Sequence, residues 1–260
     1  MKKLLLALCF IFGALVSFAG APVVEKHVGV VEDGYNFWLS SPDSIVTEPK
    51  PLIIFLHGRS LSGTDLNKVK KYGTLDAVLK GRDIDAFVLA PQVKSGPWVP
   101  SKVMDVLEYV LNRYEVDESR IYVVGMSLGG YGTIDFAATY PDIVAAAVGM
   151  CGGATVKDFT GLNEVPMWII HGTADERVPV KESDKVVEAV KNVDPDTPRL
   201  AYDRTPGINH GRLARVFYLP ELYDWLFQHS LDDEDRPIQQ PVKIDEDILG
   251  RAYQGINSRK

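Results

Sequence analysis

Short, strongly apolar runs alternate with helix-length segments through most of this 260-residue chain, and this alternation limits the possible folds. Each run is too apolar for a strand with one face in water, so it indicates a strand buried on both faces of a parallel sheet. Parallel strands need crossover connections, which the helix-length segments supply. The apolar runs are Leu52–Leu56, Ala86–Ala90, Ile121–Gly125, Val144–Met150, Met167–Ile170 and, more weakly, Leu200–Asp203.

The other predicted elements complete one mixed sheet. Two earlier runs, His27–Val31 and Tyr35–Leu39, flank the turn signal Glu32-Asp33-Gly34 and predict an antiparallel hairpin. Helices are predicted over Leu66–Leu79, Lys102–Tyr114, Leu128–Thr139, Ser183–Lys191 and Leu219–Gln228. Two antiparallel and six mostly parallel strands with helices on both faces form a doubly wound α/β sheet, whose sites gather at the carboxyl ends of its strands.

The N-terminus has the pattern of a signal peptide. A basic start is followed by an apolar stretch that ends at Val16 and by the small residues of Ser17-Phe18-Ala19. We therefore expect residues 1–19 to be removed from an exported protein, either periplasmic or secreted. A lipid anchor on Cys9 is the alternative, but no small residue precedes it where such an anchor needs one. The apolar stretch is too short for a membrane-spanning helix.

The rest of the chain indicates one globular domain, residues 20–230, and a charged tail, residues 231–260, which we expect to lie outside the core. Without the two lysines of the leader, 26 basic side chains face 35 acidic ones, a net charge of −9 that argues against nucleic acid as a partner. Cys151 is then the single cysteine, so no internal disulfide can form. We interpret Cys151 as a small buried hydrophobe.

The pentapeptide Gly125-Met126-Ser127-Leu128-Gly129 directly follows one of the apolar runs and begins the next predicted helix. Strand, tight turn and helix in this order are the setting of a nucleophile elbow, in which small flanking residues let the serine hydroxyl project above the sheet. A serine hydroxyl attacks well only when a base accepts its proton. Ser127 is therefore the candidate nucleophile, and the chain must supply the base.

Histidine suits proton exchange near neutral pH, and the chain has five. His210 alone lies in a loop after the last predicted strand, where neighbouring glycines let it reach over the sheet. We expect His210 to be the general base. His57 and His171 close buried strands, a position in which a histidine more often holds loops by hydrogen bonds.

The imidazole needs a carboxylate that fixes its tautomer and stabilises its positive charge. Asp175 closes a buried strand in a Gly-Thr-Ala-Asp turn, between the serine and the histidine in the chain, and is the candidate. Asp203, at the end of the following strand, is the reserve candidate, and Glu176 is a weaker one.

The order and setting of these motifs resemble the α/β-hydrolase superfamily over about Pro51 to His229. Within it the chain is similar to the lidless bacterial esterases of the phospholipase/carboxylesterase-like and feruloyl-esterase-like group. The short connection from Cys151 to Pro166 leaves no room for a large lid. The motifs that carry the resemblance are His57-Gly58-Arg59-Ser60, Ala90-Pro91-Gln92 followed by Trp98, the serine pentapeptide, His171-Gly172-Thr173-Ala174-Asp175 followed by Val178-Pro179, and Asn209-His210-Gly211.

Attack on an ester creates an oxyanion, which needs two preorganised N–H donors. Leu128 supplies the first, because it follows the serine at the start of a helix, where backbone amides are free. The second is expected from the loop after the Leu52–Leu56 strand, where lipases often carry His-Gly-Gly-Gly and this chain has Arg59 and Ser60, with Arg59 slightly favoured. Trp98 and Gln92 are the candidates for contact with substrate. No cofactor and no metal are expected.

Three functions are compatible with the sequence. The first is an exported serine hydrolase of short-chain, acetyl or cinnamoyl (feruloyl-type) esters, on small molecules or on polysaccharides. The second is a serine peptidase of the same fold, although such peptidases usually carry a propeller or another large domain. The third is a binding protein that retains the fold without the chemistry. The complete set of serine, acid and histidine argues against the binding protein, and the expected single domain favours the esterase over the peptidase.

Overall fold

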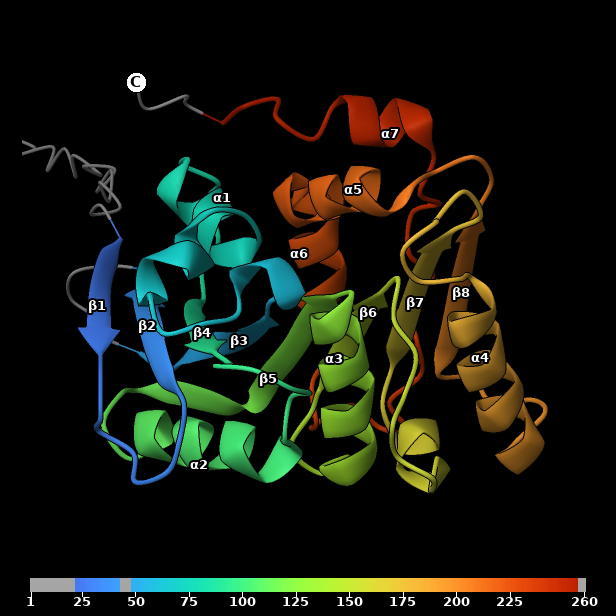
Figure 1. The fold of residues 1–260 in the computed structure, drawn as a ribbon. Helices are drawn as coiled ribbons and strands as arrows, with labels where there is room; N and C mark the ends of the chain where they lie inside the picture. Colours follow the sequence, from blue (N-terminus) through green and yellow to red (C-terminus); the bar gives the residue numbers. More distant parts are fainter. Residues whose placement is uncertain (1–21, 43–47, 257–260) are drawn as a thin grey trace, which may run out of the picture.

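Eight strands form one sheet in the order β1-β2-β4-β3-β5-β6-β7-β8 in the computed structural model, which describes residues 22–42 and 48–256 (Figure 1). The pairs β1–β2 and β2–β4 are antiparallel, and all the others are parallel. The predicted mostly parallel sheet is confirmed. Its strands are β1 (Val23–His27), β2 (Asn36–Ser41), β3 (Lys50–Leu56), β4 (Phe87–Gln92), β5 (Val116–Met126), β6 (Ala146–Met150), β7 (Met167–Gly172) and β8 (Leu200–Thr205).

Helices cover both faces of this sheet (Figure 1). Alternate residues of the central strands serve two cores: Ile53 and Phe55 of β3 belong to one, and Leu52 and Ile54 to the other. Because both faces are covered, the strands are apolar throughout, as the sequence pattern predicted. The first core packs against α1 (Thr74–Leu79), α5 (His210–Leu213), α6 (Pro220–Leu226) and α7 (Glu246–Gly250), and the second against α2 (Pro100–Leu111), α3 (Leu128–Thr139) and α4 (Lys181–Val193).

The helix predicted over Leu66–Leu79 is split in two, a 3₁₀ turn over Leu66–Lys70 and then α1. Gly73 separates them with φ of 99°, a conformation that L-residues with side chains rarely adopt. A Cβ atom at Gly73 would also lie 2.0 Å from the ring of Phe55. The break turns Tyr72 toward the centre of the molecule, where its ring packs edge-on against Phe55.

The predicted N-terminal hairpin is present, but its first strand lies earlier than expected. β1 ends at His27 instead of beginning there, and His27 pairs with Phe37 of β2. The two rings stack with centroids 4.5 Å apart, which fixes this register. The pattern at residues 28–31 therefore belongs to the connection and not to the strand.

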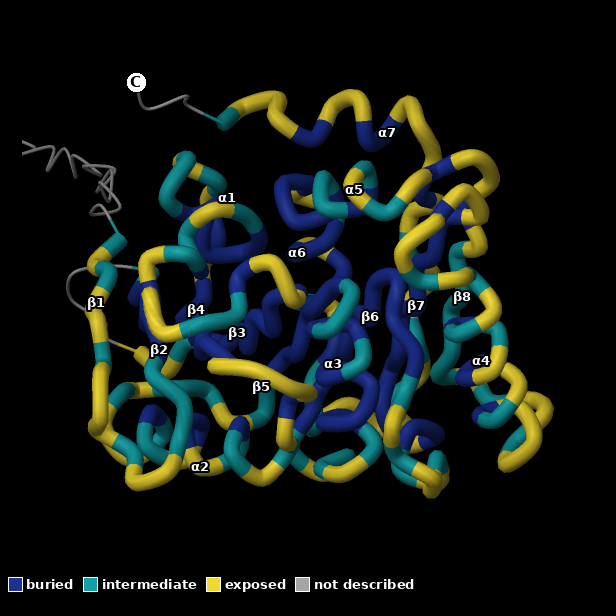
Figure 2. Tube along the Cα trace, viewed as in Figure 1, coloured by how far each residue is buried: buried dark blue, intermediate teal, exposed yellow. Residues whose placement is uncertain are grey.

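The expectation that residues 231–260 lie outside the core is wrong for the part of the tail that the structure describes. Ile244 and Leu249 are fully buried in the same core as Trp168. Figure 2 shows buried positions within α7. The carboxylate of Asp203 joins them, since it accepts hydrogen bonds from the Trp168 indole at 3.1 Å and from the Ile244 amide at 3.3 Å. The charged composition of this segment gave no sign that its few apolar residues, such as Ile244 and Leu249, pack in the core.

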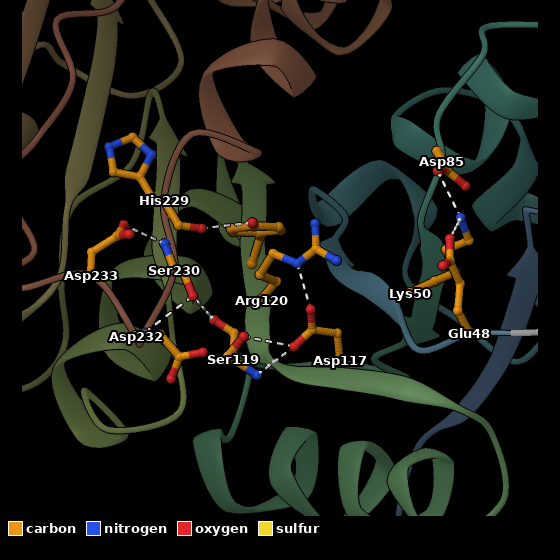
Figure 3. A network of polar contacts seen from close by, with 11 residues as sticks. Glu48, Lys50, Asp85, Asp117, Ser119, Arg120, His229, Ser230, Asp232 and Asp233 are labelled. Atoms are coloured by element: carbon orange, nitrogen blue, oxygen red, sulfur yellow. Dashed lines mark hydrogen bonds and ion pairs between the residues drawn. The ribbon is translucent and has the colours of Figure 1, made fainter.

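The amino ends of the parallel strands carry ion pairs (Figure 3). The Lys50 ammonium lies 3.0 Å from a carboxylate oxygen of Glu48 and 3.0 Å from one of Asp85. Arg120 lies 2.6 Å from Asp117 on β5. These contacts are on the surface, at the edge of the sheet opposite the one where the sequence predicts the active site.

The expected signal peptide, residues 1–19, lies outside the described residues, as does Cys9. Among the helices that the structure describes, none has the length and apolar character needed to cross a bilayer.

Candidate active site

Ser127 occupies a sharp turn between β5, which ends at Met126, and α3, which begins at Leu128. Its φ of 60° and ψ of −122° are strained for a residue with a side chain. The turn also requires its glycines: a Cβ at Gly125 would lie 2.3 Å from the Gly129 carbonyl oxygen, and one at Gly129 would lie 1.8 Å from that of Leu56. The local structure is the strand, turn and helix of a nucleophile elbow.

The register of the central strands explains which groups surround Ser127. Met126, Met150 and Ile170 pair across β5, β6 and β7, so the next residues of the three strands lie side by side at the carboxyl edge. The first of these is Ser127, the second is Cys151 and the third is His171. The sheet itself therefore brings the serine, the thiol and the start of the Asp175 turn together.

The structure places Asp175 and His210 in direct contact. His210 begins α5, and its Nδ1 lies 2.6 Å from Oδ2 of Asp175. The side chain of Asp175 is fully buried, and its other oxygen, Oδ1, accepts hydrogen bonds from the amides of Arg177 at 2.8 Å and Val178 at 2.9 Å. The carboxylate is thereby oriented by the backbone and keeps one oxygen for the imidazole. Proton donation from Nδ1 to Asp175 leaves Nε2 of His210 as the acceptor.

His171 holds the turn that carries Asp175. Its Nε2 lies 2.9 Å from the Val178 carbonyl and 3.4 Å from Oδ2 of Asp175, and its Nδ1 lies 2.7 Å from the Ser183 hydroxyl of α4. Burial lowers the pKa of His171 below the usual value for histidine. This buried arrangement agrees with the role of holding a loop that the sequence predicted.

The reserve carboxylates lie elsewhere. Asp203 is bound to Trp168 and to the C-terminal segment, and Glu176 is exposed without a hydrogen bond from its side chain to His210. The structure brings neither of them to the imidazole, which leaves Asp175 as the partner of His210.

Cys151 lies close to both Asp175 and His210. Its Sγ, a carboxylate oxygen of Asp175 and a nitrogen of His210 lie within 4.8 Å of one another, close enough in principle for a metal ion. Burial, and secondly the charge of Asp175, raise the pKa of the Cys151 thiol well above its usual value, so it stays a neutral thiol. Because Asp175 and His210 also bind each other, the arrangement suits proton transfer better than metal binding.

Two sets of backbone amides near the serine are free to donate. Leu128, at the start of α3, has no acceptor for its N–H among the described residues. The same is true of Arg59 and Ser60, which lie in a 3₁₀ turn after β3. This turn is next to the elbow, because a Cβ at Gly58 would lie 3.4 Å from the Cβ of Ser127.

The expectation that Trp98 and Gln92 contact substrate is not supported, because both side chains are buried and serve the loop after β3. Trp98 is 3% exposed and its Nε1 donates to the His57 carbonyl at 3.1 Å. Gln92 is 5% exposed and donates to the carbonyls of Leu61 at 2.7 Å and Asp65 at 2.8 Å. Buried carbonyls need such donors, so both residues hold the loop instead.

Sequence reasoning missed Tyr72, whose hydroxyl accepts a hydrogen bond from the Gly58 amide at 2.8 Å. No motif marks this residue, and it fell inside a predicted helix. The glycine that follows it was the one signal of a break in that helix.

Comparisons with known proteins show similarity to hydrolases. Residues 89–214, just under half of the chain, match the model of the dienelactone hydrolase family. Feruloyl esterase B of Talaromyces stipitatus is 23% identical over 146 residues, which cover 52% of this chain and 40% of that enzyme. A probable acetylxylan esterase A of Aspergillus clavatus is 23% identical over 166 residues, which cover 60% of this chain and 54% of that protein.

Among solved structures, a thermostable esterase superposes with a TM-score of 0.65 at 25% sequence identity, over 81% of this chain and 63% of that one. In all three pairwise matches the chain covers less than two thirds of the other protein's length. The chain has the α/β-hydrolase fold and is similar to the dienelactone hydrolase family and to these esterases.

Proposed function

We propose that this chain is an exported serine esterase that cleaves carboxylic esters through a covalent acyl-enzyme on Ser127. The observation that carries the proposal is the 2.6 Å contact between His210 Nδ1 and the buried Asp175 carboxylate, at the same sheet edge as a strained serine turn. A buried acid that orients an imidazole near a projecting hydroxyl is the arrangement that activates a serine nucleophile.

The proposed reaction begins when Nε2 of His210 accepts the hydroxyl proton of Ser127 and the serine oxygen attacks the ester carbonyl. The negative charge that develops on the carbonyl oxygen is stabilised by the Leu128 amide and by an amide of the loop after β3. His210 then gives its proton to the departing alcohol, which leaves the acyl group on Ser127. A water molecule, deprotonated by the same histidine, releases the acid.

The proposed substrates are soluble esters with an acetyl, short aliphatic or cinnamoyl-type acid, free or linked to a polysaccharide. The names of two relatives refer to feruloyl and acetylxylan ester cleavage, and this supports the choice of acids. The connection between β6 and β7 contains one short 3₁₀ turn, Thr160–Glu164, in place of inserted lid helices. An open site of this kind does not need activation at an oil–water interface.

The export part of the proposal rests on sequence alone. Residues 1–19 combine a basic start, an apolar stretch and small residues before the expected cleavage site. Export is tested by N-terminal sequencing of the protein recovered from outside the cytoplasm, which should begin near residue 20. A protein that keeps its leader, or that carries lipid on Cys9, would contradict it.

The hydrolysis proposal is tested with two substrate panels at equal concentration, one of acetyl, butyryl and feruloyl esters and one of aminoacyl and dipeptidyl anilides. We expect ester turnover, with anilides cleaved far more slowly, because amide cleavage demands tight placement of the peptide and a protonated leaving nitrogen. Anilide turnover equal to ester turnover would favour a peptidase. Turnover of neither panel, without fluorophosphonate labelling of Ser127, would favour a binding protein.

A further inference from the structure

The loop that follows β3 is held by the side chains of His57, Tyr72 and Trp98. The first peptide unit of the loop, between His57 and Gly58, is bound at both ends. Its N–H donates to the Tyr72 hydroxyl at 2.8 Å, and its carbonyl accepts a hydrogen bond from Trp98 Nε1 at 3.1 Å. This unit therefore cannot rotate without breaking two hydrogen bonds in or near the core.

The next peptide unit, between Gly58 and Arg59, is bound at its carbonyl only. The Gly58 oxygen lies 2.8 Å from Nδ1 of His57 and accepts the Leu61 amide at 3.1 Å. The peptide is trans, since the described residues contain no cis bond, and a trans peptide directs its N–H opposite to its carbonyl. The Arg59 N–H is thus aimed away from His57 and has no acceptor among the described residues.

The neighbouring amide of Ser60 is less constrained. The carbonyl of its peptide unit, that of Arg59, accepts one hydrogen bond, from the Ser62 amide at 3.1 Å, and none from a side chain. Ser60 therefore has a free N–H, but its peptide unit lacks the two hydrogen bonds to the carbonyl that orient the Arg59 N–H. Of the two candidates for the second oxyanion donor, Arg59 is the one that the loop orients before substrate arrives.

The clamping rings are themselves fixed in place. The Tyr72 ring packs against Phe55 and Phe217, with both centroid distances at 6.3 Å. The Trp98 ring meets the His57 ring edge-on at 4.9 Å. His57 is fully buried, and its Nε2 accepts the Val93 amide at 3.2 Å, so the proton of the neutral ring is on Nδ1, where it donates to Gly58.

We propose that His57, Tyr72 and Trp98 are positioning residues that preset the Arg59 N–H as the second oxyanion donor. The inference rests on the proposed function and deepens it: a donor that is oriented in advance stabilises the transition state without being reorganised during the reaction. These residues do not touch the substrate. Their loss should therefore lower kcat and leave KM nearly unchanged.

The main test is Tyr72→Phe, which removes the hydroxyl and keeps the packed ring. We expect kcat for a short ester to fall roughly tenfold with KM unchanged, since a slightly misdirected donor loses part of its effect. The dissociation constant of phenylboronic acid, a tetrahedral transition-state analogue, should rise by a similar factor. Trp98→Phe, which removes the indole donor, should act in the same direction.

The matched control is Tyr122→Phe, which removes a buried hydroxyl that donates to the His229 carbonyl at 2.8 Å, far from the loop along β5. It should leave kcat and boronate affinity unchanged. Wild-type kcat in both Tyr72→Phe and Trp98→Phe would overturn the proposal that these residues position the Arg59 N–H. A rise in KM at constant kcat would overturn it as well. If the wild-type protein cleaves no ester and Ser127 takes no label, the proposed function itself fails.

The choice of Arg59 is tested by amide NMR of protein labelled with ¹⁵N-arginine, with the Arg59 signal assigned by its loss in Arg59→Lys. Phenylboronic acid should shift the Arg59 amide proton downfield, as expected for a new hydrogen bond to an anionic oxygen. An unshifted Arg59 signal in the boronate complex would overturn the assignment.

Discussion

The two edges of the sheet both pair acids with bases, and they do so in opposite environments. At the carboxyl edge, the Asp175 side chain is 0% exposed and the His210 side chain 14%. At the amino edge, Lys50 is 17% exposed, but its partners Glu48 and Asp85 are 71% and 63% exposed (Figure 3). The acid at the carboxyl edge is thus buried, whereas the two acids that pair with Lys50 at the amino edge are exposed to solvent.

The difference in environment sets what each pair can do. Water and salt screen exposed charges, so an exposed ion pair typically contributes between 0 and about 1 kcal/mol to stability. A buried carboxylate interacts strongly with each donor around it, and losing one partner is costly. The carboxyl edge also holds two residues at positive φ, Ser127 at 60° and Cys151 at 37°. Strain and burial are concentrated at the edge where the chemistry is proposed.

The largest expected contrast comes from one substitution made at each edge. Asp175→Asn should lower kcat for a short ester by roughly 10³- to 10⁴-fold, because an amide cannot stabilise the imidazolium and favours the wrong tautomer. Asp117→Asn should leave kcat unchanged, although Asp117 also accepts hydrogen bonds, from Ser119 and Arg120. Steady-state kinetics on folded variants decide the matter. Equal losses in the two variants would remove the distinction between the edges.

The sequence predicted the frame of this arrangement well, because the frame depends on local patterns. The helix predicted over Leu128–Thr139 has the same bounds in the structure, and the buried strands follow the apolar runs. The pairing of Asp175 with His210 also followed from the order of motifs and from the ends of strands. In these places, periodicity and turn chemistry agree with the tertiary structure.

The misses depend on contacts between distant parts of the chain. The break at Gly73 exists because the ring of Phe55 fills the space beside it. Trp98 is buried with its Nε1 bonded to the His57 carbonyl. Ile244 is buried because it packs in the core that contains residues of β7. No local sequence pattern around these residues predicts these contacts, because they form between segments that are far apart in the sequence.

The second contrast is in the response of stability to pH. Burial lowers the pKa of His57 from 6.5 to about 4, so the unfolded chain binds more protons than the folded one between these values. The stability that neutral His57 provides is present above pH 6.5 and is lost as the pH falls toward 4. Between pH 7 and pH 5 this loss should be about 2 kcal/mol of unfolding free energy.

Urea unfolding of the wild type and of His57→Gln at both pH values measures this loss, since the difference between the two proteins isolates His57 from the other buried histidines. The stability contributed by the amino edge should be lost only at a lower pH. Burial alone would raise the pKa of Asp117, but hydrogen bonds from Ser119 and Arg120 outweigh it and lower the pKa below 3.8. Its contribution is therefore lost only below about pH 3.8. An identical pH response of wild type and His57→Gln would contradict the assignment.

The smallest expected effect is at the amino edge. Lys50→Met keeps the length of the side chain and removes the charge that pairs with Glu48 and Asp85. Its unfolding free energy should change by less than about 1 kcal/mol at low salt and by still less in 1 M salt. Thermal or urea unfolding measures the change. A loss of several kcal/mol that persists in high salt would mean that the charges at this edge are as little screened by solvent as those at the carboxyl edge.

The most direct test of the central claim is to identify the residue that becomes acylated. The protein is mixed with p-nitrophenyl acetate, quenched in acid within the turnover time and digested for mass spectrometry, beside Ser127→Ala and His210→Ala. We expect an acetyl group on Ser127 in the wild type and on neither variant at that time. An acetyl group on another residue, or ester turnover that continues in Ser127→Ala, would contradict the account.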